Sequence, residues 1–272
     1  MGDEAFGLKL QNAGTVDAPL VRLMIFSDRP LTPDDTTAIG QEVAQKLDLY
    51  VDLAPLNAIL DRDELMRPVL SRWRGMRVLS GSLYESLIVY VMLQNATVRR
   101  SVQMLDNLFR AYGTCLRFDG QALYCFWSPE VLDAAPEEGL RALRVGYRAK
   151  SLKRISNQFA RSEIDEKALR RLSNQELKRE LLKLYGVGPA TVWYLMFEVF
   201  HRYDAFEHIS PWEQRIYSRL LFDEELVPAE RILAEVERRW GRWKMLAAHY
   251  LFEDLFWQRR HEPVPWLEEL IR

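Results

Sequence analysis

The stretch that decides the fold is Leu184-Tyr185-Gly186-Val187-Gly188-Pro189-Ala190-Thr191, which joins two helical patterns through a short turn. Upstream, Ser173 and Glu176 have the spacing of a capping box, and downstream apolar residues repeat at helical spacing. The two glycines permit positive φ angles and let a ligand approach the backbone. Proline suits the first turn of a helix, where free N–H groups and the dipole favour an anion. We therefore predict a helical hairpin, about residues 175–202, that binds phosphate through Gly186 to Thr191. Alone, such a turn is equally typical of a helical core.

A second segment follows about twenty residues later and reads Asp204-Ala205-Phe206-Glu207-His208-Ile209-Ser210-Pro211-Trp212-Glu213. Serine at N-cap, proline at N1 and glutamate at N3 predict the start of another helix. Together with the hairpin, this segment resembles the helix–hairpin–helix superfamily of base-excision DNA glycosylases. In that family the matching loop ends in an aspartate that caps the next helix and faces the flipped nucleotide. The matching position here is Ser210, which keeps the capping role and lacks the carboxylate.

The missing carboxylate bears directly on catalysis. Cleavage of an N-glycosidic bond passes through an oxocarbenium-like state, which a nearby carboxylate stabilises. Serine cannot supply that charge, so Ser210 is a doubtful catalytic residue. Glu213 is a candidate substitute, although its ordinary role is to accept a hydrogen bond from the N-cap amide, and that interpretation is favoured.

Further segments carry the resemblance in the same order along the chain. Gln94 and Asn95 follow an apolar helix at the place where the family inserts a side chain into the DNA stack, although the pair is also typical of a helix end. The segment Gly146-Tyr147-Arg148-Ala149 is similar to the 8-oxoguanine branch. Arg148 and Lys150 are expected either to contact phosphates or to be solvated. Aromatic residues are candidates for the base pocket: Tyr84, Trp212, Trp243 and Trp257.

One position narrows the expected chemistry further. Glycosylases that also cut the strand carry a lysine two residues after the second hairpin glycine, where it forms a Schiff base. Here that residue is Ala190, so the resemblance implies a monofunctional enzyme without lysine-dependent lyase activity. It also implies a Na⁺ or K⁺ ion at the hairpin, bound by the backbone carbonyls of Leu182, Leu184 and Val187.

The composition is that of an ordinary globular protein of 272 residues, 48% hydrophobic and 28% charged. No run reaches the length of a membrane span and no signal peptide is evident, so a cytoplasmic protein, nucleoid-associated in a prokaryote, is expected. Two cysteines, Cys115 and Cys125, are expected to be free and cannot hold a four-cysteine iron–sulfur cluster. The four histidines lack the spacing of a zinc site.

The charge is unevenly distributed along the chain. The net charge is −2, yet residues 141–183 carry thirteen basic and five acidic side chains, a net +8. This polarity suits a protein that places one face on a phosphate backbone, although a basic stretch can also be a solvated helix surface. We favour the first interpretation because the stretch leads directly into the hairpin.

Two regions differ in their patterns. Residues 1–50 predict a small α+β lobe with an antiparallel sheet: strands over 6–10 and 20–26 and a helix over 33–47. Residues 51–272 predict helices almost throughout. We therefore expect a mostly α, two-lobed glycosylase fold.

Three functional hypotheses follow. The leading one is a monomeric, monofunctional DNA glycosylase that flips and excises an alkylated or oxidised purine from double-stranded DNA. The alternative is a protein of the same fold that binds damaged or distorted DNA without catalysis, because Ser210 replaces the aspartate. The third is an all-helical protein unrelated to DNA, whose binding, if any, would be insensitive to salt.

Overall fold

The computed structural model describes residues 5–16 and 18–271. The chain forms two compact units: unit 1 contains the chain up to residue 47 together with 80–188, and unit 2 contains 48–79 together with the chain from 189 onward. The chain passes from one unit to the other after Leu47, after Leu79 and after Gly188. The division into regions 1–50 and 51–272 stays a prediction.

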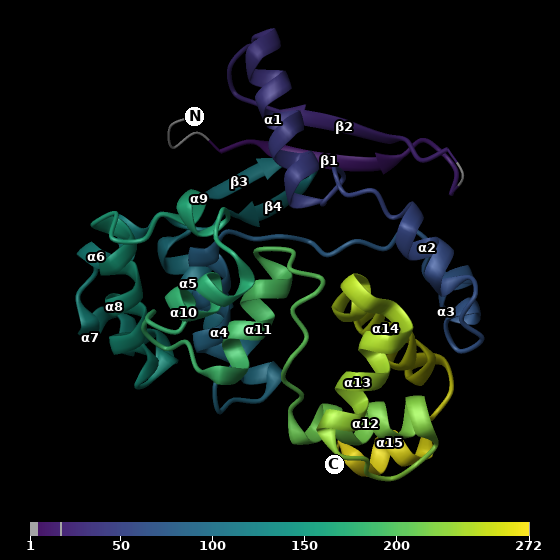
Figure 1. The fold of residues 1–272 in the computed structure, drawn as a ribbon. Helices are drawn as coiled ribbons and strands as arrows, with labels where there is room; N and C mark the ends of the chain where they lie inside the picture. Colours follow the sequence, from purple (N-terminus) through teal and green to yellow (C-terminus); the bar gives the residue numbers. More distant parts are fainter. Residues whose placement is uncertain (1–4, 17, 272) are drawn as a thin grey trace. The chain divides into compact units, whose positions relative to one another are not determined.

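Unit 1 begins with the predicted antiparallel lobe (Figure 1). Strands β1 (Gly7–Asn12) and β2 (Val21–Phe26) pair from Gly7 opposite Phe26, and helix α1 (Pro33–Lys46) follows. A second hairpin, β3 (Cys115–Phe118) and β4 (Gln121–Tyr124), was not predicted. Its turn is Asp119-Gly120, and both residues have positive φ, as a two-residue type I′ turn requires. The Phe26 and Phe118 rings lie 5.1 Å apart and join the two hairpins.

The other helices of unit 1 are α4 (Leu83–Leu93), α5 (Val98–Tyr112), α6 (Pro129–Ala134), α7 (Glu137–Leu140), α8 (Arg148–Ala160), α9 (Glu166–Leu169) and α10 (Asn174–Leu181), with a π-helical turn at Arg141–Val145. Helix α4 is mostly apolar and packs against α5 and α8, which explains its burial. Its Tyr84 hydroxyl lies 2.9 Å from the Ser156 hydroxyl and accepts a hydrogen bond from Trp127. This buried polar contact joins α4 to α8 at the centre of the unit.

The helices of unit 2 are α2 (Ala54–Leu60), α3 (Met66–Trp73), α11 (Pro189–Glu198), α12 (Pro211–Phe222), α13 (Ala229–Trp240), α14 (Lys244–His261) and α15 (Pro265–Leu270). The early helices α2 and α3 pack on α13 and α14, which are far along the chain. Fully buried apolar side chains such as Leu60, Leu70 and Trp240 form the shared core. Sequence proximity therefore does not decide which helices belong to this unit.

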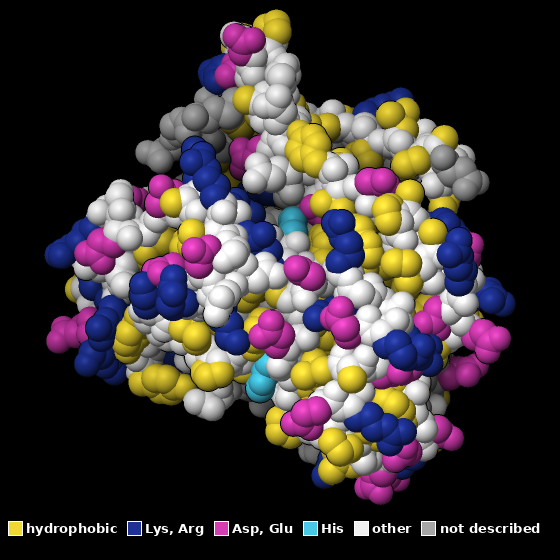
Figure 2. Space-filling model, in the orientation of Figure 1, with side chains coloured by type: hydrophobic (Ala, Val, Ile, Leu, Met, Phe, Trp, Pro, Cys, Tyr) yellow, Lys and Arg dark blue, Asp and Glu magenta, His cyan; other side chains and the backbone are white. Residues whose placement is uncertain are grey.

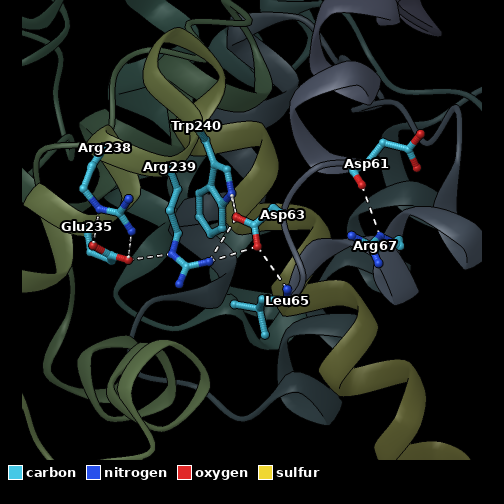
Figure 3. A network of polar contacts seen from close by, with 8 residues as sticks. All are labelled: Asp61, Asp63, Leu65, Arg67, Glu235, Arg238, Arg239 and Trp240. Carbon is cyan, nitrogen blue, oxygen red and sulfur yellow. Dashed lines mark hydrogen bonds and ion pairs between the residues drawn. The ribbon is translucent and has the colours of Figure 1, made fainter.

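A network of charged side chains holds α13 to the α2–α3 connection within unit 2 (Figure 3). The nearly buried Asp63 carboxylate accepts hydrogen bonds from Arg239 at 2.9 and 3.1 Å and from the Trp240 indole at 3.1 Å. Glu235 accepts from Arg238 and Arg239, and the hydrogen bond from Arg238 is the main cause that lowers the pKa of Glu235 to about 2. The charged side chains of this network bond to one another, so the network stabilises the fold.

The predicted fold class is confirmed: the protein is mostly α-helical with two small antiparallel sheets. Among the described residues, none of the helices has the length and apolar character needed to cross a membrane.

Candidate active site

The two helices and the connecting turn predicted from the sequence are present, with α10 in unit 1 and α11 in unit 2. Helix α10 starts at the Ser173–Glu176 capping box, in which the Ser173 Oγ accepts from the Glu176 amide at 3.3 Å and the Glu176 carboxylate accepts from the Ser173 amide at 3.0 Å. Beyond the helix, Gly186 has φ +81°, a conformation that favours glycine. This turn is exposed at Gly186 rather than buried in the core, as a ligand-binding turn must be.

The second hairpin helix, α11, opens unit 2 with Pro189 at its first position. Pro189 and Ala190 are exposed, and Thr191 is partly exposed. The amides of Ala190 and Thr191 precede the first intrahelical donor, so they are free to bind a ligand. The positive end of the helix dipole lies at the same place. The start of α11 therefore has the features that the predicted phosphate site requires.

The loop after α4 lies beside the hairpin turn within unit 1. The Gln94 side-chain amide donates a hydrogen bond to the Gly186 carbonyl at 3.4 Å. Asn95 is exposed, has φ +47°, and donates from its side chain to the Tyr147 hydroxyl at 3.3 Å. Gln94 also caps the end of α4. The exposed Asn95 is suited to insertion into DNA, whereas Gln94 caps the end of α4. Of the two interpretations of this pair, insertion therefore suits Asn95 and the helix end suits Gln94.

Arg148 differs from the expectation that it contacts phosphates or solvent. Its side chain is buried, and the guanidinium donates to the carbonyl of Val91 at 3.1 Å and to that of Gln94. It also lies over the Tyr147 ring, with 4.8 Å from Cζ to the ring centroid. Because these contacts use the guanidinium inside the protein, Arg148 positions the loop after α4 and is not free for DNA. Lys150 is exposed, as a phosphate-binding residue must be.

The basic stretch 141–183 lies wholly within unit 1, and part of its charge is neutralised there. Arg141 pairs with Glu137, Arg170 with Glu166, and Lys183 with Glu180. On the face drawn in Figure 2, basic and acidic side chains are interspersed. Glu166 and Glu180 are already counted in the net charge of +8, whereas Glu137 lies outside the stretch and reduces the positive charge available to a phosphate backbone by one.

Ser210 and Glu213 form the capping box that the sequence predicted at the start of α12. The Ser210 Oγ accepts from the Glu213 amide at 3.3 Å, and the Glu213 Oε2 accepts from the Ser210 amide at 3.0 Å. The other carboxylate oxygen, Oε1, accepts from the Tyr194 hydroxyl of α11 at 2.9 Å. The capping role predicted for Glu213 is confirmed, and its second oxygen is directed toward α11.

A pocket of about 190 Å³ lies within unit 2, enclosed by α11, α12 and α14. Its aromatic walls come from all three helices: Tyr194, Phe197, Trp212, Tyr217 and Phe252. Its polar lining consists of Glu198, Glu213, His249, Glu253 and the tyrosine hydroxyls. Apolar walls with a few directed polar groups are typical of a ligand site. Glu213 therefore lies on the wall of a cavity suited to a planar aromatic ligand.

Burial sets the protonation of several groups around this pocket. It is the main cause that raises the pKa of Tyr194 and of Tyr217, and the Glu213 charge raises both further. Burial lowers the pKa of His249, partly offset by the charge of Glu253. At neutral pH the tyrosines are therefore protonated donors and His249 is a neutral imidazole.

Of the four aromatic residues predicted for the base pocket, Trp212 alone lines this cavity. Tyr84 is buried in unit 1, where its hydroxyl is used by α8. Trp243 is in the core of unit 2 and stacks on Tyr203 at 5.9 Å, and Trp257 packs edge-on against Trp73 at 6.3 Å. Tyr84 lines a separate cavity within unit 1, so these three residues do not share the cavity of Trp212, and their role in base binding stays a prediction.

Residues that sequence reasoning missed supply much of the lining. His249 and Glu253 are four residues apart on α14, and Tyr194 and Glu198 are four apart on α11, so each pair shares a helix face. That spacing was visible in the sequence, but nothing in it indicated that the two faces meet. Cys115 and Cys125 are both free, as expected. In the described part of the chain, no group of three or more His, Cys, Asp or Glu side chains could hold a metal ion.

The mostly α-helical fold and the turn at Gly186 agree with the resemblance to helix–hairpin–helix DNA glycosylases drawn from the sequence. No protein-family model matches the sequence. A probable N-glycosylase/DNA lyase from Methanothermobacter thermautotrophicus is 24% identical over 212 residues, 71% of this chain and 67% of that protein.

Solved structures agree on the fold. The apo 8-oxoguanine glycosylase/lyase from Clostridium acetobutylicum is 22% identical, with a TM-score of 0.70 over 90% of this chain and 81% of that one. The 3-methyladenine DNA glycosylase from Archaeoglobus fulgidus is 18% identical, with a TM-score of 0.75 over 94% and 85%. Homologues and structural neighbours are thus 8-oxoguanine and 3-methyladenine DNA glycosylases of the helix–hairpin–helix superfamily, which confirms the resemblance inferred from the sequence.

Proposed function

We propose that this chain is a DNA glycosylase of base-excision repair, which hydrolyses the N-glycosidic bond of an alkylated or oxidised purine in double-stranded DNA. One observation carries the proposal: the Glu213 carboxylate lies on the wall of an aromatic pocket, held between the Ser210 amide and the Tyr194 hydroxyl. Relatives that are DNA glycosylases support the same role.

Glu213 would supply the negative charge that Ser210 lacks. As the bond to the base breaks, the sugar acquires oxocarbenium character, and a fixed carboxylate stabilises that charge and directs a water molecule to the sugar. Two hydrogen bonds hold Glu213 in place, so little reorganisation is needed during the reaction. The same hydrogen bonds reduce the charge density on the carboxylate. We therefore expect slower catalysis than from an unencumbered aspartate, and a preference for bases that leave easily.

DNA would be bound through the hairpin and the loop after α4. The free amides at the start of α11 suit a phosphate, with Gly186 to Thr191 forming the predicted segment, and Asn95 would enter the stack when the nucleotide flips out. Ala190 offers no amine for a Schiff base, so the strand would stay intact. A Na⁺ or K⁺ ion at the carbonyls of Leu182, Leu184 and Val187 stays a prediction, testable by replacing both ions with Tris buffer in a DNA-binding titration.

The test is base release from duplexes carrying 7-methylguanine, 3-methyladenine or 8-oxoguanine, under single-turnover conditions. Glu213→Gln keeps the size of the side chain and removes its charge, and it should slow release by about 10² or more. Glu176→Gln is the matched control, because Glu176 makes the same capping box at the start of α10. Equal rates for native protein and Glu213→Gln would refute the catalytic role of Glu213. Borohydride trapping of a protein–DNA adduct would refute the absence of a Schiff base.

A protein that binds damaged DNA without catalysis is the second candidate. The observation that favours it is that both Glu213 oxygens already accept hydrogen bonds, whereas Ser210 has no charge. Ser210→Asp separates the two candidates. If native protein releases no base, binds DNA in a salt-dependent way and is not activated by this substitution, the binding role is correct.

A further inference from the structure

In the part of the chain that the structure describes, the pocket between α11, α12 and α14 is lined by acidic side chains without positively charged ones to balance them. Three of its lining residues are glutamates, Glu198, Glu213 and Glu253, and among the described residues that line it there is neither a lysine nor an arginine. Carboxylates accept hydrogen bonds and do not donate them when ionised. Aromatic rings beside them attract cations through their faces. The cavity therefore suits a planar ligand that carries N–H donors and a positive charge.

The three glutamates are not equally available to such a ligand. Glu213 is held by Ser210 and Tyr194, as described above. The charge of Glu198 acts on Tyr194 and raises its pKa, behind burial and Glu213. Glu253 forms no hydrogen bond or ion pair with another described residue, and its charge acts on the neighbouring His249. Glu253 is thus the pocket carboxylate with free acceptor sites.

His249 stands one helical turn before Glu253 and lines the same cavity. Its ring packs edge-to-face against Phe197, with the centroids 5.1 Å apart, which fixes the plane of the imidazole. Its ring nitrogens form no hydrogen bond with the described residues. A neutral imidazole offers one donor and one acceptor. Helix α14 therefore presents a free carboxylate and a free imidazole side by side on the pocket wall.

We propose that Glu253 and His249 determine which base this pocket accepts: Glu253 accepts N–H hydrogen bonds from a positively charged N-alkylated guanine, while His249 donates to the carbonyl oxygen of that base. This inference rests on the proposed glycosylase function. A guanine carries two adjacent donors, N1–H and the exocyclic amine, next to a carbonyl oxygen, and a carboxylate beside a donor matches that edge. An adenine carries one amine donor beside a ring acceptor, which matches less well.

The positive charge of the alkylated base is the second property by which the pocket would select its ligand. Alkylation at N7 gives the guanine ring a positive charge in DNA, whereas 8-oxoguanine has the same hydrogen-bonding edge without the charge. An ionised Glu253 makes a charge-assisted hydrogen bond to either base, but only the alkylated base adds an attraction between opposite charges, which is strong at close range away from bulk water. The carboxylate of Glu253 should therefore favour 7-methylguanine over 8-oxoguanine, and its hydrogen-bonding geometry should favour 7-methylguanine over 3-methyladenine.

The experiment compares native protein with Glu253→Gln, His249→Phe and Glu262→Gln. The last is a matched control, because Glu262 is exposed at the end of the same helix and does not line the pocket. Single-turnover base release is measured for the three lesions. Glu253→Gln should reduce release of 7-methylguanine by roughly tenfold or more, and release of 8-oxoguanine much less. His249→Phe should reduce release of both guanine lesions, and Glu262→Gln should change nothing. Equal losses on all three lesions, or none, would overturn the inference while leaving the glycosylase function intact.

A binding measurement separates this inference from failure of the proposed function. The cationic nucleoside 7-methylguanosine and neutral guanosine are titrated against quenching of tryptophan fluorescence, because Trp212 lines the pocket. If native protein releases no base, the inference still stands when 7-methylguanosine binds more tightly than guanosine and Glu253→Gln removes the difference. It is overturned when the two nucleosides bind equally, or when Glu253→Gln leaves their difference unchanged.

Discussion

Replacement of Arg148 by methionine tests whether this residue holds the loop after α4 rather than DNA. The side chain is buried, and its guanidinium donates to the carbonyls of Val91 and Gln94 at the carboxyl end of that helix. A cation at this end also complements the helix dipole. Methionine fills a similar volume but leaves both carbonyls without their donor.

The expected loss can be worked out from these contacts. A hydrogen bond from a charged donor contributes about 1.5–3 kcal/mol, so two give about 3–6 kcal/mol. Removing a buried charge recovers part of its desolvation cost, and the net free energy of unfolding should fall by about 3 kcal/mol. For a chain of this size that corresponds to a fall in Tm of roughly 6–12 °C.

Thermal unfolding followed by circular dichroism measures the stability, and hydrogen exchange measures the order of the loop. The amides of residues 94–97 should exchange faster in Arg148→Met than in native protein. Lys150→Met is the matched control, because Lys150 is exposed two residues further along α8 and should change stability by about 0.5 kcal/mol or less. If Arg148→Met and Lys150→Met unfold at the same temperature, Arg148 does not hold this loop.

Two further predictions concern stability. Burial alone would raise the pKa of Asp48, but hydrogen bonds from His201 and Tyr203 lower it overall. The ionised Asp48 therefore stabilises the folded protein fully above the unfolded carboxyl pKa of about 4, and this stabilisation is lost as the pH falls through the lower folded pKa. Asp48→Asn should therefore lower Tm at neutral pH and flatten its decline in acid, and an unchanged acid decline would contradict this. Gly186→Ala should lower the free energy of unfolding, measured by urea denaturation, by about 1–2 kcal/mol, because φ at Gly186 is +81°. Gly188→Ala is the control, because a Cβ at Gly188 meets no atom within 4 Å. Equal losses of stability in the two variants would exclude backbone strain as the cause.

Much of the fold could be predicted because the helix starts have local causes. Ser173 with Glu176, and Ser210 with Glu213, are capping boxes whose partners are three residues apart, and both form as predicted. The β3–β4 hairpin was missed although its signal is also local. Asp119-Gly120 between two short alternating strands is a strong hairpin pattern, and the surrounding helical periodicity concealed it.

The site was predicted less well because a pocket depends on which helix faces meet. Trp212 lines the cavity, since it sits in the first turn of α12 beside Glu213, and its role in base binding stays a prediction. Trp243 was chosen for the same aromatic character, yet it is in the core and stacks on Tyr203. Arg148 was expected to contact phosphates or to be solvated, but it is buried, and its burial depends on two carbonyls that lie more than fifty residues earlier.

By itself, the sequence determined where the helices begin, that the hairpin turn needs Gly186, and that Ser210 brings no carboxylate to its position. These features depend on residues within one or two helical turns, so local chemistry is sufficient. The tertiary structure alone decided that Glu213 also meets Tyr194, and that His249 and Glu253 line the same cavity as Trp212. Those contacts join helices α11, α12 and α14, and their geometry is set by the packing of a core to which all three contribute.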